Sequence, residues 1–106
     1  MSSKEKGAIL EFSMIPLDKG EHFSEFVAGS IKIVKESGLP YKFGPMSTAI
    51  EGTFEECIEV VTKCFENMSD YSNRVSLNLK VDFKRGRENG LETKIKSVEN
   101  KLKKMQ

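Results

Sequence analysis

The sequence lacks the residue types and runs that mark several large classes of protein. Its 106 residues include no tryptophan, one histidine and two cysteines. No apolar run approaches the ~18 residues that a membrane-spanning helix needs, so we expect no membrane partner. The formal net charge of +1 falls short of the basic excess that phosphate binding normally shows, so we expect no nucleic-acid partner either.

The cysteines and the histidine are too few and too scattered to predict a metal site. Cys57 and Cys64 share one face of a predicted helix, but two turns separate them by roughly 10 Å. That separation is too long for a disulfide within one helix. His22 lies in another predicted element, and no zinc-ligand spacing is present. We therefore expect two reduced core thiols, no metal and no cofactor.

Size and composition fit one globular domain spanning residues 1–106. Hydrophobic residues make up 38% of the chain and charged residues 31%, as is usual for soluble proteins. The N-terminal "MSSKEKG" is polar and leads directly into strand-like alternation. It does not resemble a signal peptide, and we expect a cytoplasmic location.

Catalytic signatures are also missing. The sequence has no nucleophile elbow, no glycine-rich phosphate loop and no cysteine–histidine pairing. The predicted central strands lack the aromatic residues that an RNA-binding sheet uses to stack bases. Binding without chemistry is the function that these absences favour, and we expect a protein that is not an enzyme.

Hydrophobic periodicity predicts seven elements. Residues 8–15 and 74–83 alternate with a period of two, which indicates strands with one buried face. Residues 21–37, 53–68 and 90–105 repeat their apolar positions every three or four residues, which indicates helices. Residues 41–43 and 47–51 flank Gly44-Pro45 as a short hairpin, and Thr53 with Glu56 has the spacing of a helix capping box.

The element order predicts an α+β fold of the ferredoxin-like βαββαβ type over about 8–84, followed by an extra C-terminal helix over about 90–105. Right-handed connections give a four-stranded antiparallel sheet with strand order 4-1-3-2. The spacing of the last helix is heptad-like, which is compatible with an intersubunit seam. We nevertheless expect this helix to pack on its own domain.

Two helices cover only one side of such a sheet, so the other side must face water, a ligand or a partner. The outward residues of the first and last strands converge there: Glu11, Ser13, Asn78, Lys80 and Asp82. If Ile50 points to the helices, Ser47, Ala49 and Glu51 join them and Thr48 faces the core; the other register reverses this. The face is either simply solvated, with ion pairs contributing about 0–1 kcal/mol, or a polar-lined cavity between two facing sheets.

Three segments carry a family resemblance: "LEFSMIPLDKG", "SGLPYKFGPMSTAIEG" and "RVSLNLKVDFKR". Together they resemble the small ferredoxin-like thiamine-binding protein family, from about Ala8 to Leu102. Residue by residue, the resemblance implicates Ser13, Pro16, Tyr41, Pro45, Met46, Thr48, Glu51, Gly52, Arg74, Asp82 and Arg85. The sequence departs from the family pattern at Ser47, where a glycine is usual, and in a longer turn, "PLDKG".

The resemblance implies a non-catalytic protein that binds thiamine or its hydroxymethylpyrimidine precursor. It also implies self-association to a dimer or tetramer with facing sheets, which puts the site at an oligomer interface. The alternative function is a regulatory or oligomerisation module that senses another small metabolite. Ligand-induced thermal stabilisation favours the binding protein, whereas stabilisation by a protein partner alone favours the module.

Residue chemistry is compatible with this ligand. An aminopyrimidine suits Ser13, Asn78 or a carboxylate, and the positive thiazolium suits Glu11, Glu51 or Asp82. No diphosphate-binding motif is present, which favours free thiamine or a precursor. The predicted ligand-binding residues are Glu11, Ser13, Tyr41, Ser47, Thr48, Glu51, Asn78, Asp82 and Arg85, with Glu51 as the main contact.

Overall fold

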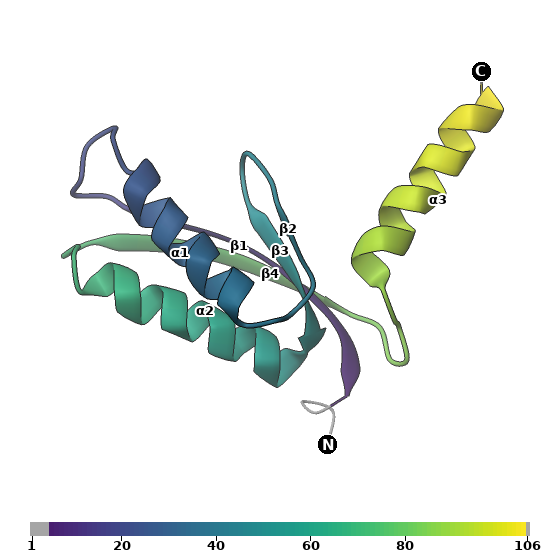
Figure 1. Cartoon of the computed structure of the whole chain (residues 1–106), viewed down its shortest axis with the longest axis horizontal. Helices are drawn as coiled ribbons and strands as arrows, with labels where there is room; N and C mark the ends of the chain where they lie inside the picture. The colour runs from purple at the N-terminus through teal and green to yellow at the C-terminus, as the bar shows by residue number, and fades with distance from the viewer. Residues whose placement is uncertain (1–4, 106) are drawn as a thin grey trace.

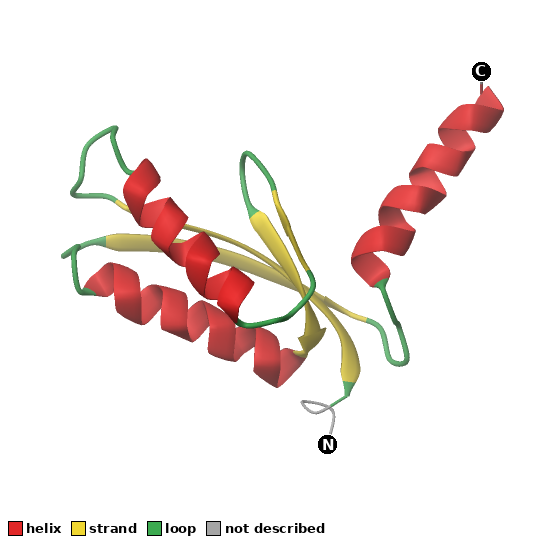
Figure 2. Cartoon of the chain, in the orientation of Figure 1, coloured by secondary structure: helices red, strands yellow, loops and turns green. Residues whose placement is uncertain are grey.

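The computed structural model describes residues 5–105 and forms a helix-covered antiparallel sheet (Figures 1 and 2). The first four residues of the polar N-terminal segment lie outside the described part. The sheet order β2-β3-β1-β4 is the predicted order 4-1-3-2 counted from the other edge, so the predicted fold is confirmed. The elements are β1 (Lys6–Pro16), α1 (Ser24–Glu36), β2 (Tyr41–Phe43), β3 (Thr48–Thr53), α2 (Phe54–Ser69), β4 (Val75–Phe83) and α3 (Gly90–Met105).

Local sequence signals set the ends of the two packed helices. At the start of α2, Glu56 N–H donates to Thr53 Oγ1 at 3.0 Å, and Thr53 N–H donates to Glu56 Oε1 at 2.9 Å, which confirms the predicted capping box. Helix α1 ends before Gly38, whose φ of +79° is accessible to glycine at little cost. Its first helical residue is Ser24, slightly later than predicted.

Strand register decides which residues share a side of the sheet. Ile50 lies opposite Leu10, and both are fully buried. Directly opposed residues of an antiparallel pair point to the same side, so Ile50 faces the helices. The register question is therefore settled: Thr48 lies on the helix-covered side, whereas Ala49 and Glu51 lie on the open side.

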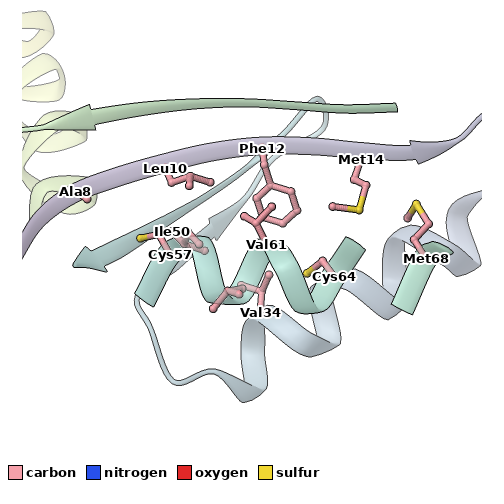
Figure 3. Packing of buried hydrophobic residues seen from close by; sticks show 11 residues of the cluster. Ala8, Leu10, Phe12, Met14, Val34, Ile50, Cys57, Val61, Cys64 and Met68 are labelled. Carbon is pink, nitrogen blue, oxygen red and sulfur yellow. The ribbon is translucent and has the colours of Figure 1, made fainter. Parts of the chain in front are cut away.

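The core is built on the inner side of β1 (Figure 3). Side chains of this strand and of β3 pack against both helices, and the buried cluster contains Ala8, Leu10, Phe12, Met14, Val34, Ile50, Cys57, Val60, Val61, Cys64 and Met68. Both cysteines are buried and free, as predicted. Burial raises the pKa of each thiol to about 11, which keeps both protonated and unreactive at neutral pH.

The inward residues of β4 are less covered than the alternation predicts. Leu77, Leu79 and Phe83 lie opposite the core residues Met14, Phe12 and Ala8, so their predicted direction is right. They are nevertheless 37%, 45% and 39% exposed. The reason is that β4 is an edge strand, and α2 packs mainly on β1 and β3.

The prediction that the C-terminal helix packs on its own domain is wrong beyond its first turn. Gly90 and Leu91 are buried against the open side of the sheet, where Ile9 lies. The rest of α3 projects away from the sheet (Figure 1). Its later apolar residues, from Ile95 to Met105, are 49–81% exposed.

The capping box gives a test of the local account. Replacing Thr53 by alanine removes the acceptor for the Glu56 N–H, so we expect the free energy of unfolding to fall by about 1 kcal/mol. The matched control is Thr62→Ala inside the same helix, where alanine is the better helix former. Urea denaturation of the two variants measures the difference. Equal stabilities would contradict the assigned cap.

Candidate ligand site

Polar side chains from β1, β4 and the β2–β3 turn meet at a small hollow on the open side of the sheet, called here the open-face hollow. Glu11 lies between Lys80 and Ala49 in the register, and Ser13 lies opposite Asn78. Ser47 Oγ donates to Glu11 Oε2 at 3.0 Å. The hollow has a volume of about 130 Å³ and is lined by Glu11, Phe12, Ser13, Ser47, Asn78, Leu79 and Lys80. Four of the predicted ligand residues therefore come together here.

An apolar cleft adjoins this hollow at the β2–β3 turn and is called here the hairpin cleft. Pairing between β1 and β3 ends at Phe12 and Thr48, and the cleft occupies the space beyond that pair. It has a volume of about 140 Å³ and is lined by Phe12, Ser13, Met14, Ile15, Phe23, Val27, Ser30, Ile31, Phe43, Gly44, Pro45, Met46, Ser47 and Thr48. Ser13 and Ser47 line both spaces, so hydroxyl groups stand between an apolar wall and a carboxylate.

The sequence shapes the cleft through the turn "FGPMS". Gly44 N–H donates to the Ser47 carbonyl oxygen at 2.9 Å, which closes the turn. A Cβ on Gly44 would lie 3.0 Å from that same oxygen, so a side chain there is disfavoured. Pro45 presets the backbone for a turn. The turn thus holds Met46, which is 85% exposed, at the rim of the cleft.

Glu51, the predicted main contact, is already engaged by the protein. Its Oε2 accepts a hydrogen bond from Gly90 N–H at 2.6 Å, and its Oε1 accepts one from Leu91 N–H at 3.1 Å. The residue is only 7% exposed. A carboxylate at a helix N-terminus satisfies free backbone N–H groups and is stabilised by the helix dipole. In this structure Glu51 anchors the first turn of α3.

Asp82 belongs to the same anchor. Its Oδ2 accepts from Lys94 Nζ at 2.8 Å and from Arg87 at 3.1 Å. These two cations lower the pKa of the Asp82 carboxyl below its ordinary value. Because the folded-state pKa is lowered, the stabilisation is complete above the ordinary value of 3.8 and is lost as the pH falls through the lowered pKa. Arg87 also donates to the Gly7 carbonyl oxygen at 2.8 Å, which ties the β4–α3 loop to β1.

Tyr41 and Arg85 lie away from the open-face hollow. Tyr41 is paired with Ile50, so it faces the helices and packs against the core. Arg85 Nε donates to Glu5 Oε2 at 2.6 Å on an exposed part of the surface. The nine predicted residues thus divide into four at the hollow, Thr48 in the adjoining cleft, two in the α3 anchor and these two elsewhere.

A larger hollow of about 370 Å³ lies beside the start of α3. Glu51, Glu56 and Arg87 line it, and each already has a protein partner: the α3 backbone, Thr53 N–H and Asp82 respectively. These three charged groups therefore already have structural roles. Within residues 5–105, no cluster of three or more His, Cys, Asp or Glu side chains is placed to hold a metal ion, and none of the helices described is long and apolar enough to cross a membrane.

Sequence reasoning missed two parts of this arrangement. The first is the aromatic wall of the cleft, which includes Phe23 and Phe43. This wall forms because the β2–β3 hairpin separates from β1, and the hydrophobic alternation of the strands does not predict that separation. The segment "KRGRENG", between the last predicted strand and the C-terminal helix, reads by composition only as a charged loop. The "NG" at Asn89 and Gly90, directly before an apolar helical repeat, is the signal that an N-terminus begins there and needs an acceptor.

Comparison with known proteins gives a consistent picture. A family model described as "Thiamine-binding protein" matches residues 10–99. The UPF0045 protein Mb1933 of Mycobacterium bovis is 37% identical over 95 residues, covering 89% of this chain and 93% of that protein. The solved structure of MJ1052 from Methanocaldococcus jannaschii has a TM-score of 0.80 at 30% identity, over 86% of this chain and 94% of that one.

A Thermotoga maritima structure, that of a protein with a proposed role in thiamine biosynthesis or salvage, has a TM-score of 0.76. It covers 86% of this chain and 97% of that one, at 24% identity. At this level of identity the likeness shows the shared fold alone.

The anchor gives a prediction that separates structure from binding. Glu51→Ala leaves two N–H groups of α3 without acceptors, so we expect the free energy of unfolding to fall by about 1–2 kcal/mol. We also expect faster hydrogen exchange at Gly90 and Leu91. The matched control is Glu66→Ala, an exposed glutamate on α2. If both variants had the parent's stability and exchange rates, the anchor would have no energetic role.

Proposed function

Since this chain belongs to the thiamine-binding protein family, we propose that it binds thiamine, or the hydroxymethylpyrimidine part of thiamine, and performs no chemistry on it. The observation that carries the proposal is the junction of the open-face hollow with the hairpin cleft. An apolar cleft with a few convergent polar groups is the usual form of a small-molecule site. Here the polar groups are hydroxyls, an amide and a carboxylate.

The pyrimidine ring fits the hairpin cleft by its chemistry. A flat aromatic ring gains by leaving water for walls such as Phe12 and Phe43. Its amino group and ring nitrogens need acceptors and donors at the edge, and Ser13, Ser47 and Thr48 supply hydroxyls that both donate and accept. Asn78, directly opposite Ser13, adds an amide at the junction with the hollow.

The positive thiazolium ring fits the open-face hollow. Glu11 presents the carboxylate there, and its register neighbour Lys80 is the nearest basic side chain on β4. The carboxylate is held toward Ser47 by a hydrogen bond of 3.0 Å, which fixes one oxygen and leaves the other available. If the pocket binds thiamine more tightly than the neutral pyrimidine precursor, the Glu11 charge accounts for the difference in affinity.

The open side of a single sheet covers only one face of a ligand. We propose that a second copy closes the site by placing its own open face opposite, in a dimer or tetramer. Exclusion of water would then strengthen the attraction between Glu11 and a cationic ligand, because the local dielectric falls. Glu51 and Asp82 act in this proposal as positioning residues, since they hold α3 at the end of the same face.

Titration calorimetry with thiamine and with hydroxymethylpyrimidine tests these assignments. Glu11→Gln keeps the shape and the hydrogen bond to Ser47 but removes the charge. We expect it to weaken thiamine binding about tenfold, which is about 1.4 kcal/mol, and to change hydroxymethylpyrimidine binding little. Asn78→Ala should weaken the binding of both ligands.

The matched control is Glu66→Gln, which removes an exposed carboxylate on the far side of α2. It should bind both ligands as the parent does. The proposal fails if neither ligand binds the parent protein below millimolar concentration, or if Glu11→Gln and Asn78→Ala bind as tightly as the parent.

A further inference from the structure

Only one asparagine in the sequence is followed directly by glycine, and this pair, Asn89 and Gly90, begins α3. Asn89 is exposed, and its φ of +54° lies in the left-handed region, which asparagine tolerates better than most residues. In such a pair the glycine nitrogen is a nucleophile for the asparagine side-chain amide, because glycine has no side chain to block the approach and leaves the backbone free to turn. The pair is therefore a candidate for spontaneous chemical change.

The reaction is a deamidation by way of a cyclic imide. The Gly90 nitrogen bonds to Cγ of Asn89, the bond from Cγ to Nδ2 breaks, and the Gly90 proton leaves with Nδ2 as ammonia. Water then opens the imide ring. Opening at Cγ gives aspartate, whereas opening at the main-chain carbonyl carbon gives isoaspartate, in which the main chain runs through Cβ and Cγ. Each product differs from the parent by the replacement of one NH by one oxygen atom.

The folded structure opposes this reaction at the attacking nitrogen. The Gly90 N–H donates to Glu51 Oε2 at 2.6 Å, and Gly90 is buried. The Asn89 carbonyl oxygen accepts from the Thr93 N–H at 3.0 Å, so the peptide between Asn89 and Gly90 is held at both ends. Closing the imide ring requires rotation of this peptide, which both hydrogen bonds resist. The reaction therefore proceeds from a locally opened form, and its rate is the rate of the open chain multiplied by the opened fraction.

We propose that Asn89 is a site of spontaneous deamidation and that Glu51 controls its rate by holding the first turn of α3 on the sheet. The modification needs only water and the protein's own backbone nitrogen. It is independent of the ligand site, because neither Asn89 nor Gly90 lines the open-face hollow or the hairpin cleft. The anchor thus protects the chain chemically as well as positioning the helix.

The isoaspartyl product does not fit the anchored turn. It adds one carbon atom to the main chain directly before Gly90, where the packing leaves no spare room. A single Cβ on Gly90 would lie 2.8 Å from Ile9 Cδ1 and 2.9 Å from Arg87 Cδ. The longer main chain also displaces the Gly90 N–H relative to Glu51. Formation of isoaspartate therefore releases the first turn of α3 from the open face, and the release is irreversible.

Peptide mapping by mass spectrometry after prolonged incubation of the full-length protein at neutral pH tests the proposal. The parent, Glu51→Ala and the control Glu66→Ala, which removes an exposed glutamate of α2, are incubated together with a sample of the parent in concentrated urea. The replacement of NH by oxygen at Asn89 is measured in each, and isoaspartate is distinguished from aspartate by labelling with an isoaspartyl methyltransferase. Asn73, exposed in the α2–β4 loop and followed by arginine, is the internal reference.

We expect Asn89 of the parent to deamidate several-fold more slowly in buffer than in urea. Glu51→Ala should deamidate about 5–30 times faster than the parent, which is the factor by which the expected loss of stability raises the opened fraction. Glu66→Ala should match the parent, and the rate at Asn73 should be the same in all the folded samples. Equal rates at Asn89 in the parent and in Glu51→Ala would overturn the proposal, and so would an absence of reaction at Asn89 in urea.

A milder variant covers the case in which Glu51→Ala does not fold, as judged by circular dichroism. Glu51→Gln keeps the shape of the side chain and one accepting oxygen, so it retains an acceptor for only one of the two N–H groups of α3. Its rate of deamidation at Asn89 should lie between that of the parent and that of the urea sample. A rate equal to that of the parent would contradict control by the Glu51 carboxylate.

The isoaspartyl form of the parent, separated from the unreacted protein by chromatography, tests the structural consequence. Amide hydrogen exchange at Leu91 and Thr93 should be faster in this form than in the unreacted protein. Exchange at Leu10, which is fully buried in β1, should be unchanged and serves as the control. Unchanged exchange at Leu91 would contradict the release of α3.

Discussion

The hydrogen bonds from Gly90 and Leu91 to the Glu51 carboxylate determine where α3 starts on the sheet and how much of the open face stays exposed. They fix the first turn of α3 at one end of the open face, where that turn buries Ile9 and leaves Glu11, Ser13 and Asn78 accessible. They also set the direction in which the rest of the helix leaves the sheet. One buried carboxylate therefore limits the extent of the ligand face and directs an apolar helix towards solvent.

Much of the fold follows from local patterns. The alternation of β1 and β4, the capping box at Thr53 and the glycine after α1 are short-range signals, and the element order leaves few topologies. The role of Glu51 could not be predicted, because its partner lies 39 residues away and becomes visible only when α3 is placed. The exposure of Leu79 could likewise not be predicted from the sequence, because it depends on how much of the sheet the two helices cover.

The candidate site was predicted in part. Glu11, Ser13, Ser47 and Asn78 meet because outward residues of neighbouring strands must share a face once the order is known. Thr48 lines the adjoining cleft from the helix-covered side of the sheet. Both possible registers of β3 placed the ligand residues on the open side alone, so neither predicted this contact.

An NMR titration of the labelled protein with hydroxymethylpyrimidine tests the central claim most directly, that the ligand binds where the hairpin parts from β1 and not at the α3 anchor. The account predicts the largest amide shift changes at Ser13, Ser47, Thr48 and Asn78, with Gly90 and Leu91 nearly unchanged. Shift changes concentrated at Gly90 and Leu91, with the hairpin unaffected, would instead make Glu51 the ligand contact and contradict the account.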